Sequence, residues 1–502
     1  MLSQYFFHLT VLLTFTSCIR YNLYIIFIRV KDLDFIEKLI GDVNNALYTY
    51  ILIVLLVLGG LFFTFRTRFV QFRLFKEQIK AVTQKPTDGK GVSSFQALMV
   101  STASRVGTGN IVGVSTALCL GGFGSVFWMW VIALIGGASA FVESTLAQIF
   151  KKKNSDGTCS GGPAYYIMAV LKNKPLAIIF SVLLILTYGV GFNMLASYNL
   201  QSTFSSYSFY NAESSPWIIG LILAVICGYC LIGGGKRVIK VTSSLVPIMG
   251  VAYIVIAVVI SVLNIGALPS VFKTIFTQAF DLKAIFGGFT GSCVMFGIKR
   301  GLFSNEAGVG SAPNASASAE VDHPVKQGLV QVLSVFIDTI LVCSATAFMC
   351  MSSGVEPSAE LSGAPFVQAA LTETLGAFGP IFITVAMILF AFTTLLGNLY
   401  YVDMTLIFIC GKIPSKKFMT VYRLIASFLI FLGAGLSADL LWGIADITMG
   451  GMTLINMPVI IILSKYAMKA LKNYDSQKKA GKDPVFRAVD VEIPYEMVDY
   501  WK

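Results

Sequence analysis

Residues 105–110 (RVGTGN) stand inside an apolar segment that is long enough to cross a membrane. The two glycines that flank Thr108 make a poor helix interior. An unwound backbone at membrane depth is tolerated only where it lines a cavity or is buried in protein. Its freed N–H groups and carbonyls can then bind a carboxylate and a cation. The alternative is a close-packing glycine motif capped by Asn110.

A second glycine-interrupted segment lies in the other half of the chain. It starts at residues 287–291 (GGFTG) and continues through Lys299 and Arg300 to residues 304–310 (SNEAGVG). Paired interruptions in corresponding halves are the best sequence indication of a transporter's binding site. We expect the charged half of this segment to emerge into the cytoplasm. The alternative is that its glycines serve close packing alone.

Two adjacent hydroxyls, those of Thr393 and Thr394, lie in a third apolar segment. Hydroxyl oxygens are hard donors that suit Na⁺ when they are combined with backbone carbonyls. The alternative is that each threonine bonds back to the carbonyl one turn earlier. From these residues alone, the alternative is the better interpretation.

Four acidic residues fall inside apolar segments: Glu143, Asp338, Asp403 and Asp446. Ionisable residues within a membrane are functional candidates by default. Glu143 and Asp403 lie near cytoplasmic ends of their segments, where an interfacial position explains them. Asp338 lies midway, and we interpret it as a structural acceptor; the alternative is a proton carrier. Its candidate partners are Arg105, Lys299 and Arg300.

No pattern indicates an enzyme, a cofactor or a metal centre. The sequence at 233–236 (GGGK) lacks the spacing and the Ser or Thr of a nucleotide-binding loop. With only His8 and His323, no nucleophile and base pair stands out. Cys227 and Cys230 have CxxC spacing but lie in an apolar segment without a second pair, so packing explains them.

The composition predicts a membrane protein. Of the 502 residues, 56% are hydrophobic and only 13% are charged, which is more apolar surface than a soluble chain can bury. A membrane helix needs about 20 apolar residues. Eleven such segments are expected, at 46–65, 93–119, 124–150, 175–205, 215–232, 243–263, 284–302, 328–352, 379–409, 420–436 and 441–465.

The charges between these segments orient them. Lys and Arg gather in the loop after the first segment, in the loops at 150–174, 233–242 and 410–419, and in the tail after Tyr466. The loops at 120–123, 206–214, 353–378 and 437–440 contain neither residue. Cytoplasmic loops carry the positive excess. The net charge of +11 therefore indicates topology, not nucleic-acid binding, and places the C-terminus in the cytoplasm.

The sequence divides the chain into three regions. Residues 1–31 form an apolar N-terminal extension that is signal-like, an extra helix or the product of a misassigned start. Residues 32–470 form the transmembrane domain, and residues 471–502 form a cytoplasmic tail. We expect residues 1–31 to be dispensable.

Several long motifs, in order, resemble the alanine or glycine:cation symporters, also called sodium:alanine symporters. They include RVGTGNIVGV at 105–114, GGPAYYI at 161–167, IKRGLFSNEAGVGSAP at 298–313, FIDTILVCSATA at 336–347 and ADITMGGMTLIN at 445–456. The resemblance covers residues 34 to 470. It implies an all-α, leucine-transporter-like fold with two inverted five-helix repeats and one extra helix. It also implies Na⁺-coupled uptake of alanine, glycine or a relative such as serine or glutamine, across a bacterial inner membrane.

The resemblance also implies site residues. The substrate carboxylate should meet the N–H groups of Thr108 and Gly109, with Asn110 beside it. Sodium should lie between the carbonyls of Ala103 and Val106 and the hydroxyls of Thr393 and Thr394. Phe296 and Gly297 should line the pocket. Structural or gating roles fall to Arg105, Glu143, Arg300, Glu306 and Asp338.

The chain departs from the family pattern at the pocket. Ala196 and Tyr198 replace a common Gln and Asn, and Asn398 replaces a common Trp. A pocket changed in this way should gain room and a polar edge, which favours serine, asparagine or glutamine over alanine. The alternative is that Tyr198 refills the space and leaves a small pocket.

Two other functions fit the sequence, and a channel fits it less well, because interrupted helices suit alternating access better. One is a proton-coupled amino-acid carrier that uses Asp338 or Glu143. The other is a non-transporting paralogue, in which the altered pocket binds but does not transport. No nucleic acid or ATP is expected as a partner.

Overall fold

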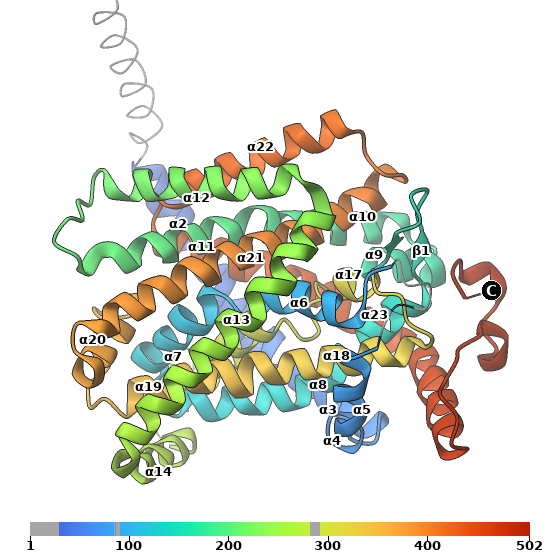
Figure 1. The fold of residues 1–502 in the computed structure, drawn as a ribbon, viewed down its shortest axis with the longest axis horizontal. Helices are drawn as coiled ribbons and strands as arrows, with labels where there is room; N and C mark the ends of the chain where they lie inside the picture. Colours follow the sequence, from blue (N-terminus) through green and yellow to red (C-terminus); the bar gives the residue numbers. More distant parts are fainter. Residues whose placement is uncertain (1–29, 85, 87–90, 282–291, 502) are drawn as a thin grey trace, which may run out of the picture.

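Helices run along the long axis of the molecule in the computed structural model, which describes residues 30–84, 86, 91–281 and 292–501 (Figure 1). The first half contains α2 (Val30–Ala46), η1 (Leu47–Leu52), α3 (Ile53–Arg66), α4 (Val70–Arg73), α5 (Phe75–Val82), α6 (Ser94–Arg105), η2 (Gly109–Gly113), α7 (Val114–Gly121), α8 (Ser125–Ile149), α9 (Pro163–Tyr166), η3 (Ile167–Leu171), α10 (Lys174–Leu184), η4 (Ile185–Gly191), α11 (Phe192–Ser202), η5 (Thr203–Ser206) and α12 (Ser215–Ile232). Two short strands, β1 (Lys152–Lys153) and β2 (Cys159–Ser160), pair antiparallel after α8.

The second half contains α13 (Gly234–Leu263), η6 (Ile265–Ala267), α14 (Leu268–Ala279), α16 (Cys293–Asn305), α17 (Pro313–Ser316), α18 (Pro324–Val335), η8 (Phe336–Cys343), α19 (Ser344–Met351), α20 (Ala364–Leu375), α21 (Phe378–Cys410), α22 (Lys416–Gly433), α23 (Ala438–Lys479), η9 (Ala488–Val491) and η10 (Tyr495–Met497).

Eight helical stretches of the described chain are long and apolar enough to cross a membrane. The expected segments at 93–119, 284–302 and 420–436 correspond to α6–η2–α7, α16 and α22 and fall outside that group. The expected number of eleven crossings stays a prediction. The all-α class is confirmed, because helices are nearly the only regular elements among the described residues.

Three expected boundaries are wrong. The first segment begins before residue 46, because the helical stretch runs from Glu37 to Arg66. The loop at 233–242 is helical, since α13 begins at Gly234. Likewise, α23 does not end near residue 465 but continues for 42 residues to Lys479. At 1.5 Å per residue this helix is about 63 Å long, which is about twice the hydrocarbon core of a bilayer. Hydropathy finds the apolar part of a helix and misses its polar extension.

Serine caps set the starts of both helices that precede an interruption. Ser93 accepts a hydrogen bond from the Gln96 N–H, and the Gln96 side chain accepts one from the Ser93 N–H, which fixes the start of α6. Ser292 accepts from the Met295 N–H at the start of α16. These caps satisfy N–H groups that a helix cannot pair internally.

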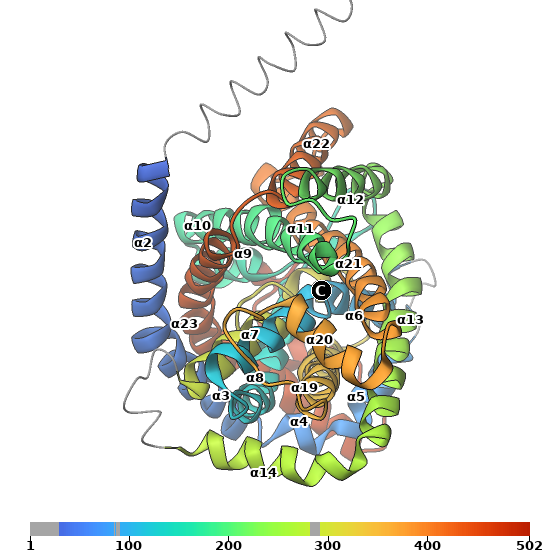
Figure 2. The same cartoon turned by 90° about the vertical axis from the view of Figure 1, so that its left-hand side faces the viewer.

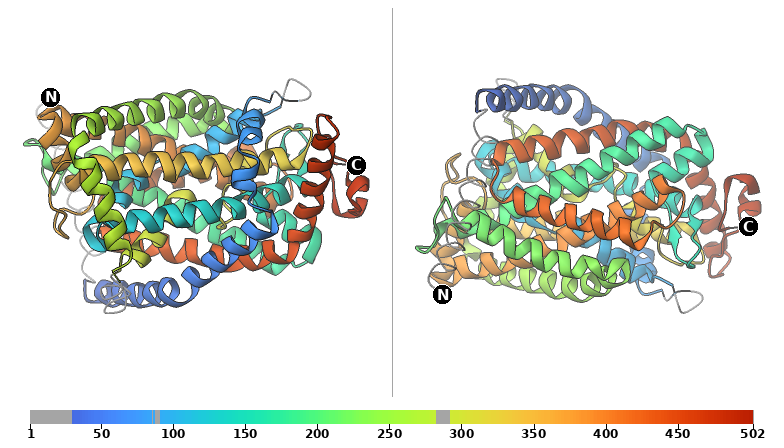
Figure 3. Two further views of the ribbon diagram at one scale, coloured as in Figure 1. Left: turned by 90° about the horizontal axis from the view of Figure 1, so that it is seen from below. Right: turned by 90° about the horizontal axis from the view of Figure 1, so that it is seen from above.

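The two ends of the bundle differ. α5, the β1–β2 hairpin, the last turns of α23 and the C-terminus gather at one end, while α14 and α20 lie at the other (Figures 1 and 3). We call the former the basic end, after its Lys80, Lys151, Lys326 and Lys478. Viewed along the bundle, α6, α7 and α8 are central, whereas α2 and α13 are peripheral (Figure 2). The interrupted helix is therefore surrounded by other helices.

Candidate functional site

The interruption expected after Arg105 is present, and the side chain of Asn110 holds it open. α6 ends at Arg105, with Val106 extended, and η2 begins at Gly109. The Gly107 N–H donates to Asn110 Oδ1 at 2.8 Å, and the Asn110 N–H donates to the Gly107 carbonyl at 3.1 Å. In an unbroken helix these two N–H groups would bond to the carbonyls of Ala103 and Val106. Both carbonyls therefore lose their helical donors.

Thr108 and Gly109 lie at the start of the helical half that follows. N–H groups in the first turn of a helix have no carbonyl one turn earlier to bond to, and they attract anions. The Thr108 hydroxyl accepts a hydrogen bond from Asn199 Nδ2 at 3.2 Å, which anchors this turn to α11. A Cβ on Gly109 would lie 2.9 Å from the Phe303 ring, so the bare backbone is needed here.

The two threonines of α21 have different surroundings. The Thr393 hydroxyl donates back to the Leu389 carbonyl at 2.9 Å and lies 3.4 Å from Met249 Sδ. Thr394 Oγ1 is buried and has no hydrogen-bond partner among the described residues. It packs against the bare Cα of Gly107, where any Cβ would collide with it. The structure thus brings Thr394, but not Thr393, to the interruption.

Asp338 lies in η8, beside the same interruption, and is fully buried. Its two oxygens accept from Asn110 Nδ2 at 2.7 Å, Ser304 Oγ at 2.7 Å and Thr339 Oγ1 at 2.8 Å. The expected ion pairs of Asp338 with Lys299 or Arg300 are not formed in the described part of the chain, because those cations pair elsewhere. Neutral donors from η2, α16 and η8 satisfy the carboxyl group instead.

The second interruption among the described residues follows Asn305 and is lined by Glu306. Glu306 takes the left-handed conformation that ends α16, at φ 55°. One carboxylate oxygen lies 3.0 Å from Ser104 Oγ, and the other accepts from Ser311 Oγ at 2.6 Å. Ser104 Oγ is also 2.7 Å from Asn398 Oδ1, and Asn398 Nδ2 donates to Asn193 at 2.9 Å. A buried polar chain therefore joins α6, α21 and α11.

The expectation for this second interruption is wrong in one respect and falls outside the described residues in another. The glycines at 287–291 lie outside the described residues, so the expectation for them is not addressed. The charged half does not emerge: Lys299, Arg300 and Glu306 are 8%, 5% and 1% exposed. Pairing with buried partners compensates their loss of hydration, which a single sequence does not reveal.

Arg105 is the cation at the centre of these groups. Its Nη1 donates to Gln331 Oε1 at 2.9 Å, while its Nε and Nη2 have no hydrogen-bond partner among the residues described. Glu143, expected at an interface, is fully buried and accepts from Asn456 Nδ2 at 2.9 Å and from the Gly308 N–H at 3.4 Å. Arg105 attracts the carboxylates of Glu143, Glu306 and Asp338 electrostatically.

Aromatic rings cover the Gly109 turn on its other side. The ring centres of Phe192 and Phe303 are 4.5 Å apart, and those of Phe303 and Trp442 are 4.7 Å apart. The Arg300 guanidinium lies 3.8 Å from the centre of the Trp442 ring. The stack joins α11, α16 and α23.

A buried ion-pair cluster adjoins this aromatic stack. Asp446 of α23 pairs with Lys299 at 2.8 Å and with Arg300 at 3.5 Å, and it accepts from Asn44 Nδ2 at 3.3 Å. Two cations and one carboxylate thus tie α16 to α23, and the Asn44 amide joins α2 to the same carboxylate. Asp403, the last of the four acids found in apolar segments, pairs with Arg423 at 2.9 Å.

A narrow pocket lies between the interruption and the aromatic stack, with a cavity volume of about 10 Å³. That is room for about one water molecule, so an amino acid enters only if the walls move apart. Its lining consists of Ser104, Arg105, Gly107, Thr108, Gly109, Phe192, Leu195, Phe303 and Thr394.

Five residues that the sequence placed at the substrate are not in this lining. Asn110 is one of them, because its side chain bonds to Gly107 and Asp338. A Cβ on Gly297 would lie 2.5 Å from the Ser125 carbonyl, so Gly297 packs against α8, and Phe296 is the neighbouring residue on α16. Ala196 is buried on α11, and Asn398 faces Ser104 and Asn193. The α16 wall is instead formed by Phe303.

Sequence reasoning missed Phe192, Leu195, Phe303 and Gln331. Phenylalanine and leucine carry no signal in a chain that is mostly apolar. Gln331 was detectable, since a polar residue near the start of a membrane segment needs a partner. Its partners, Arg105 and Ser101, lie more than 200 positions away in sequence.

Curated proteins resemble this chain along nearly its whole length. The "Amino-acid carrier protein AlsT" of Bacillus subtilis is 42% identical over 458 residues, which cover 91% of this chain and 96% of that protein. The "Probable sodium/glutamine symporter GlnT" of the same organism is also 42% identical, over 93% of this chain and 96% of its own length.

A solved structure has the same fold. MhsT, determined in complex with L-phenylalanine, superposes with a TM-score of 0.50 over 81% of this chain and 92% of its own, at 15% sequence identity. The leucine-transporter-like fold expected from the sequence is thereby confirmed. The family model described as "Sodium:alanine symporter family" matches residues 33–488. The chain belongs to the sodium:alanine symporter family, and it is a secondary transporter.

Proposed function

We propose that this protein imports a small neutral amino acid together with Na⁺, by alternating access around the interruption of α6. One observation carries the proposal. The buried Thr394 hydroxyl, which lacks a hydrogen-bond partner among the described residues, faces the interruption beside the released carbonyls of Ala103 and Val106. The proposal includes no catalytic step, no ATP and no resident cofactor.

Three oxygens from the interruption and α21 form the proposed sodium site. The carbonyls of Ala103 and Val106 have lost their helical donors, and Thr394 contributes its hydroxyl. Thr393 Oγ1, assigned with them from the sequence, donates to Leu389 and contacts Met249. We therefore assign Thr393 to helix packing and keep Thr394 as the side-chain ligand.

The substrate carboxylate is proposed to bind the N–H groups of Thr108 and Gly109. Partial positive charge at the start of a helix favours an anion there. Asn110 does not reach the substrate in this arrangement, because its oxygen accepts from Gly107 and its nitrogen donates to Asp338. It acts by holding the interruption open.

The side chain of the substrate is proposed to be small. Phe192, Leu195 and Phe303 give the pocket apolar walls, and the Asn398 amide is occupied by Ser104 and Asn193. These contacts favour alanine or glycine over the polar substrates expected from the sequence. The similarity to the glutamine symporter keeps glutamine as the competing candidate.

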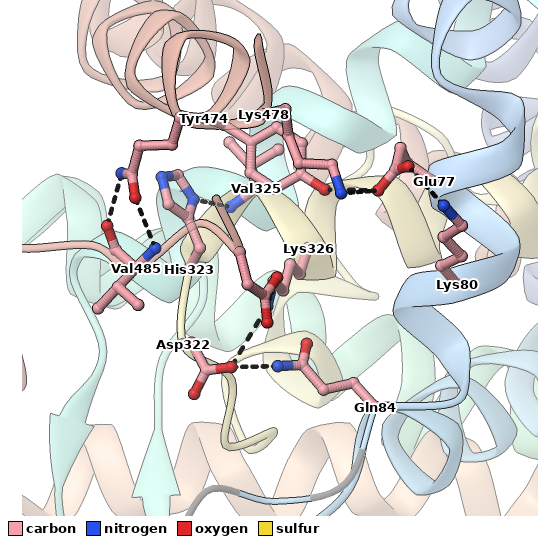
Figure 4. Close-up of polar contacts among 12 residues, drawn as sticks. Glu77, Lys80, Gln84, Asp322, His323, Val325, Lys326, Tyr474, Lys478 and Val485 are labelled. Carbon is pink, nitrogen blue, oxygen red and sulfur yellow. Dashed lines mark hydrogen bonds and ion pairs between the residues drawn. The ribbon is translucent and has the colours of Figure 1, made fainter. Parts of the chain in front are cut away.

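The basic end is proposed to face the cytoplasm of a bacterial cell, with the C-terminus inside and the inner membrane as the location. Lys80, Lys326 and Lys478 lie there (Figure 4), and Lys151 contacts Tyr500 near the C-terminus, as the positive-inside rule expects.

A proton-coupled carrier is the second candidate. One guanidinium, that of Arg105, attracts three buried carboxylates electrostatically, so a proton on one of them would reduce the excess negative charge. Against this, Asp338 accepts three hydrogen bonds, and donors of this kind stabilise the charged form. The geometry therefore favours Na⁺ as the coupling ion.

Purified protein in proteoliposomes separates the candidates. With labelled alanine outside, an inward Na⁺ gradient should drive accumulation, and an inward H⁺ gradient without Na⁺ should not. Accumulation driven by H⁺ alone would identify the proton carrier. Binding without uptake under either gradient would identify a non-transporting protein.

Competition by unlabelled amino acids then ranks substrates. Alanine and glycine should compete best against labelled alanine. Stronger competition by glutamine or asparagine would show that the pocket widens beyond its present walls. In that case Asn398→Trp, which restores the residue common in the family, should shift the order toward alanine.

A further inference from the structure

The chain after α23 folds back onto the basic end of the bundle. Residues 480–501 include η9 and η10, and the Ala488 N–H donates to the Trp501 carbonyl at 3.2 Å, which closes this segment into a loop. Phe486 and Trp501 are only 3% and 7% exposed. A segment with such buried aromatic side chains is packed against the bundle.

Trp501 and its neighbours dock where α8 ends. The Trp501 indole N–H donates to the Gln148 carbonyl at 2.6 Å. The Lys151 ammonium lies 3.9 Å from the centre of the Tyr500 ring and 5.2 Å from that of Trp501, within cation–π distance. Asp499 accepts from the Lys153 N–H at 3.1 Å. Three consecutive tail residues therefore hold one short stretch of chain.

The same stretch holds the ends of both interrupted helices. Lys151 Nζ and Gln148 Nε2 each donate to the Ala319 carbonyl at 2.9 Å. Ala319 forms a parallel bridge with Val92, and the Glu320 N–H donates to the Val92 carbonyl at 2.9 Å. Val92 precedes α6, and Ala319 follows α17. The segments that lead from the two interruptions to the basic end thus meet beneath Trp501.

A second set of contacts anchors the start of the segment. The Phe486 N–H donates to the Asp322 carbonyl at 2.9 Å, and the Phe486 ring meets the edges of His323 and Trp501. Asp483 pairs with Lys326 at 3.4 Å.

The end of α23 is itself fixed to the bundle (Figure 4). Lys478 pairs with Glu77 of α5 at 3.0 Å, and the Tyr474 hydroxyl donates to the same carboxylate at 3.2 Å. The Gln477 side chain exchanges two hydrogen bonds with the backbone of Val485, at 2.8 and 3.0 Å. The segment thus leaves a helix that is held in place at its end.

We infer that residues 480–501 are a strap that holds the meeting point of the two interrupted helices closed at the basic end, and that this strap releases when the pathway opens there. The inference rests on the proposed alternating access. Opening at the basic end requires the segments at Val92 and Ala319 to move apart or to leave α8. Gln148 and Lys151 oppose both movements, and Trp501 holds Gln148 and Lys151.

A reversible cross-link tests whether release is needed. Lys153 and Asp499 are both exposed and adjacent, so Lys153→Cys with Asp499→Cys can be joined by a short bis-methanethiosulfonate reagent. The cross-linked protein should lose sodium-driven alanine uptake, and a reductant should restore it. Each single cysteine variant, treated alike, is the matched control. Unchanged uptake by the cross-linked protein would overturn the inference.

A second measurement does not depend on any substrate. Cys159 of β2 is 3% exposed and pairs in register with Lys153, close to the docked tail. Trp501→Ala should make maleimide labelling of Cys159, located by peptide mass spectrometry, about tenfold faster, because an indole hydrogen bond and a cation–π contact are lost. Tyr495→Ala removes an exposed aromatic residue of the same segment and should leave the rate unchanged.

The two measurements separate the strap from the transport proposal. Equal labelling of Cys159 in the wild type and in Trp501→Ala would overturn the strap, whatever the protein transports. Faster labelling in a protein that carries no amino acid would show that the tail docks at β2 but would refute the proposed function.

Discussion

At the scale of single residues, the proposed transport depends on a few polar atoms placed at an interrupted helix. Asn110 takes the Gly107 N–H and thereby releases the carbonyl of Ala103. Thr394 faces the same gap with a hydroxyl that makes no hydrogen bond within the described chain. A buried polar atom without a partner costs roughly 1–3 kcal/mol. A bound cation would remove that cost. Thr393 already has a hydrogen-bond partner and Thr394 has none among the described residues, so comparing the two threonines tests the proposed site.

Thr394→Val and Thr393→Val give a matched comparison. Thr394→Val removes the proposed ligand oxygen at nearly constant shape, so the half-saturating Na⁺ concentration for uptake should rise by about tenfold or more, the equivalent of about 1.4 kcal/mol. Thr393→Val removes a hydroxyl that donates to Leu389, so its Na⁺ dependence should stay near that of the wild type. Uptake at graded Na⁺ concentrations measures both. Equal effects of the two variants would refute the assignment to Thr394.

At the scale of elements, charged residues join helices that are distant in sequence. Asp446 links α23 to Lys299 and Arg300 of α16 and to Asn44 of α2. Removing the partner of a buried charge is far more costly than removing the pair. The cluster therefore predicts a stability effect that depends on which member is changed.

Asp446→Asn should destabilise the protein by about 3–5 kcal/mol, because it leaves two buried cations without a counter-charge. The melting temperature in detergent reports this loss. Lys299→Met combined with Asp446→Asn should recover part of it. Asp439→Asn, an exposed change in the first turn of the same helix, is the control. An unchanged melting temperature for Asp446→Asn would mean that Asp446 does not hold α16.

His323 caps the start of α18. Its Nδ1 accepts a hydrogen bond from the Val325 N–H, and its Nε2 lies 3.2 Å from Asn473 Oδ1. Burial lowers the pKa of His323 to about 3, with smaller effects from the Asn473 hydrogen bond, which raises it, and from Lys326, which lowers it. Its unfolded pKa is about 6.5. The folded state therefore binds fewer protons between these values, and its stability falls as pH drops below about 6.5.

His323→Asn keeps a capping oxygen and removes the titrating ring. Its melting temperature should fall less than that of the wild type between pH 7 and about pH 5. Parallel profiles for the two proteins would show that His323 is not buried in its neutral form.

Some features of the site could be predicted from the sequence and others could not. The interruption at 105–110 follows from residues that disfavour a helix locally, so its position could be predicted. The burial of Lys299, Arg300 and Glu306 could not, because it depends on Asp446, Ser104 and Ser311, which only the fold brings near. The same holds for Phe303, whose role comes from its position over Gly109. Local chemistry is visible in one sequence, whereas pairing across the bundle is not.

At the scale of the whole molecule, the protein is a bundle with its interrupted helices inside and a docked tail at one end (Figures 1 and 2). The family match spans residues 33–488 and so includes α23 and part of the tail.

Residues 1–31 precede the family match, and a chain that starts at Asp32 should insert and transport normally. Loss of insertion without rescue by another leader would show that residues 1–31 are a topological element.

The central claim is that Na⁺ and the amino acid cross together through the site at the α6 interruption. Simultaneous uptake of labelled Na⁺ and labelled alanine into the same proteoliposomes tests it most directly. Alanine outside should increase Na⁺ entry into vesicles that contain the wild type, and Thr394→Val should abolish this increase at low Na⁺. Alanine entry without any accompanying Na⁺ would contradict the account.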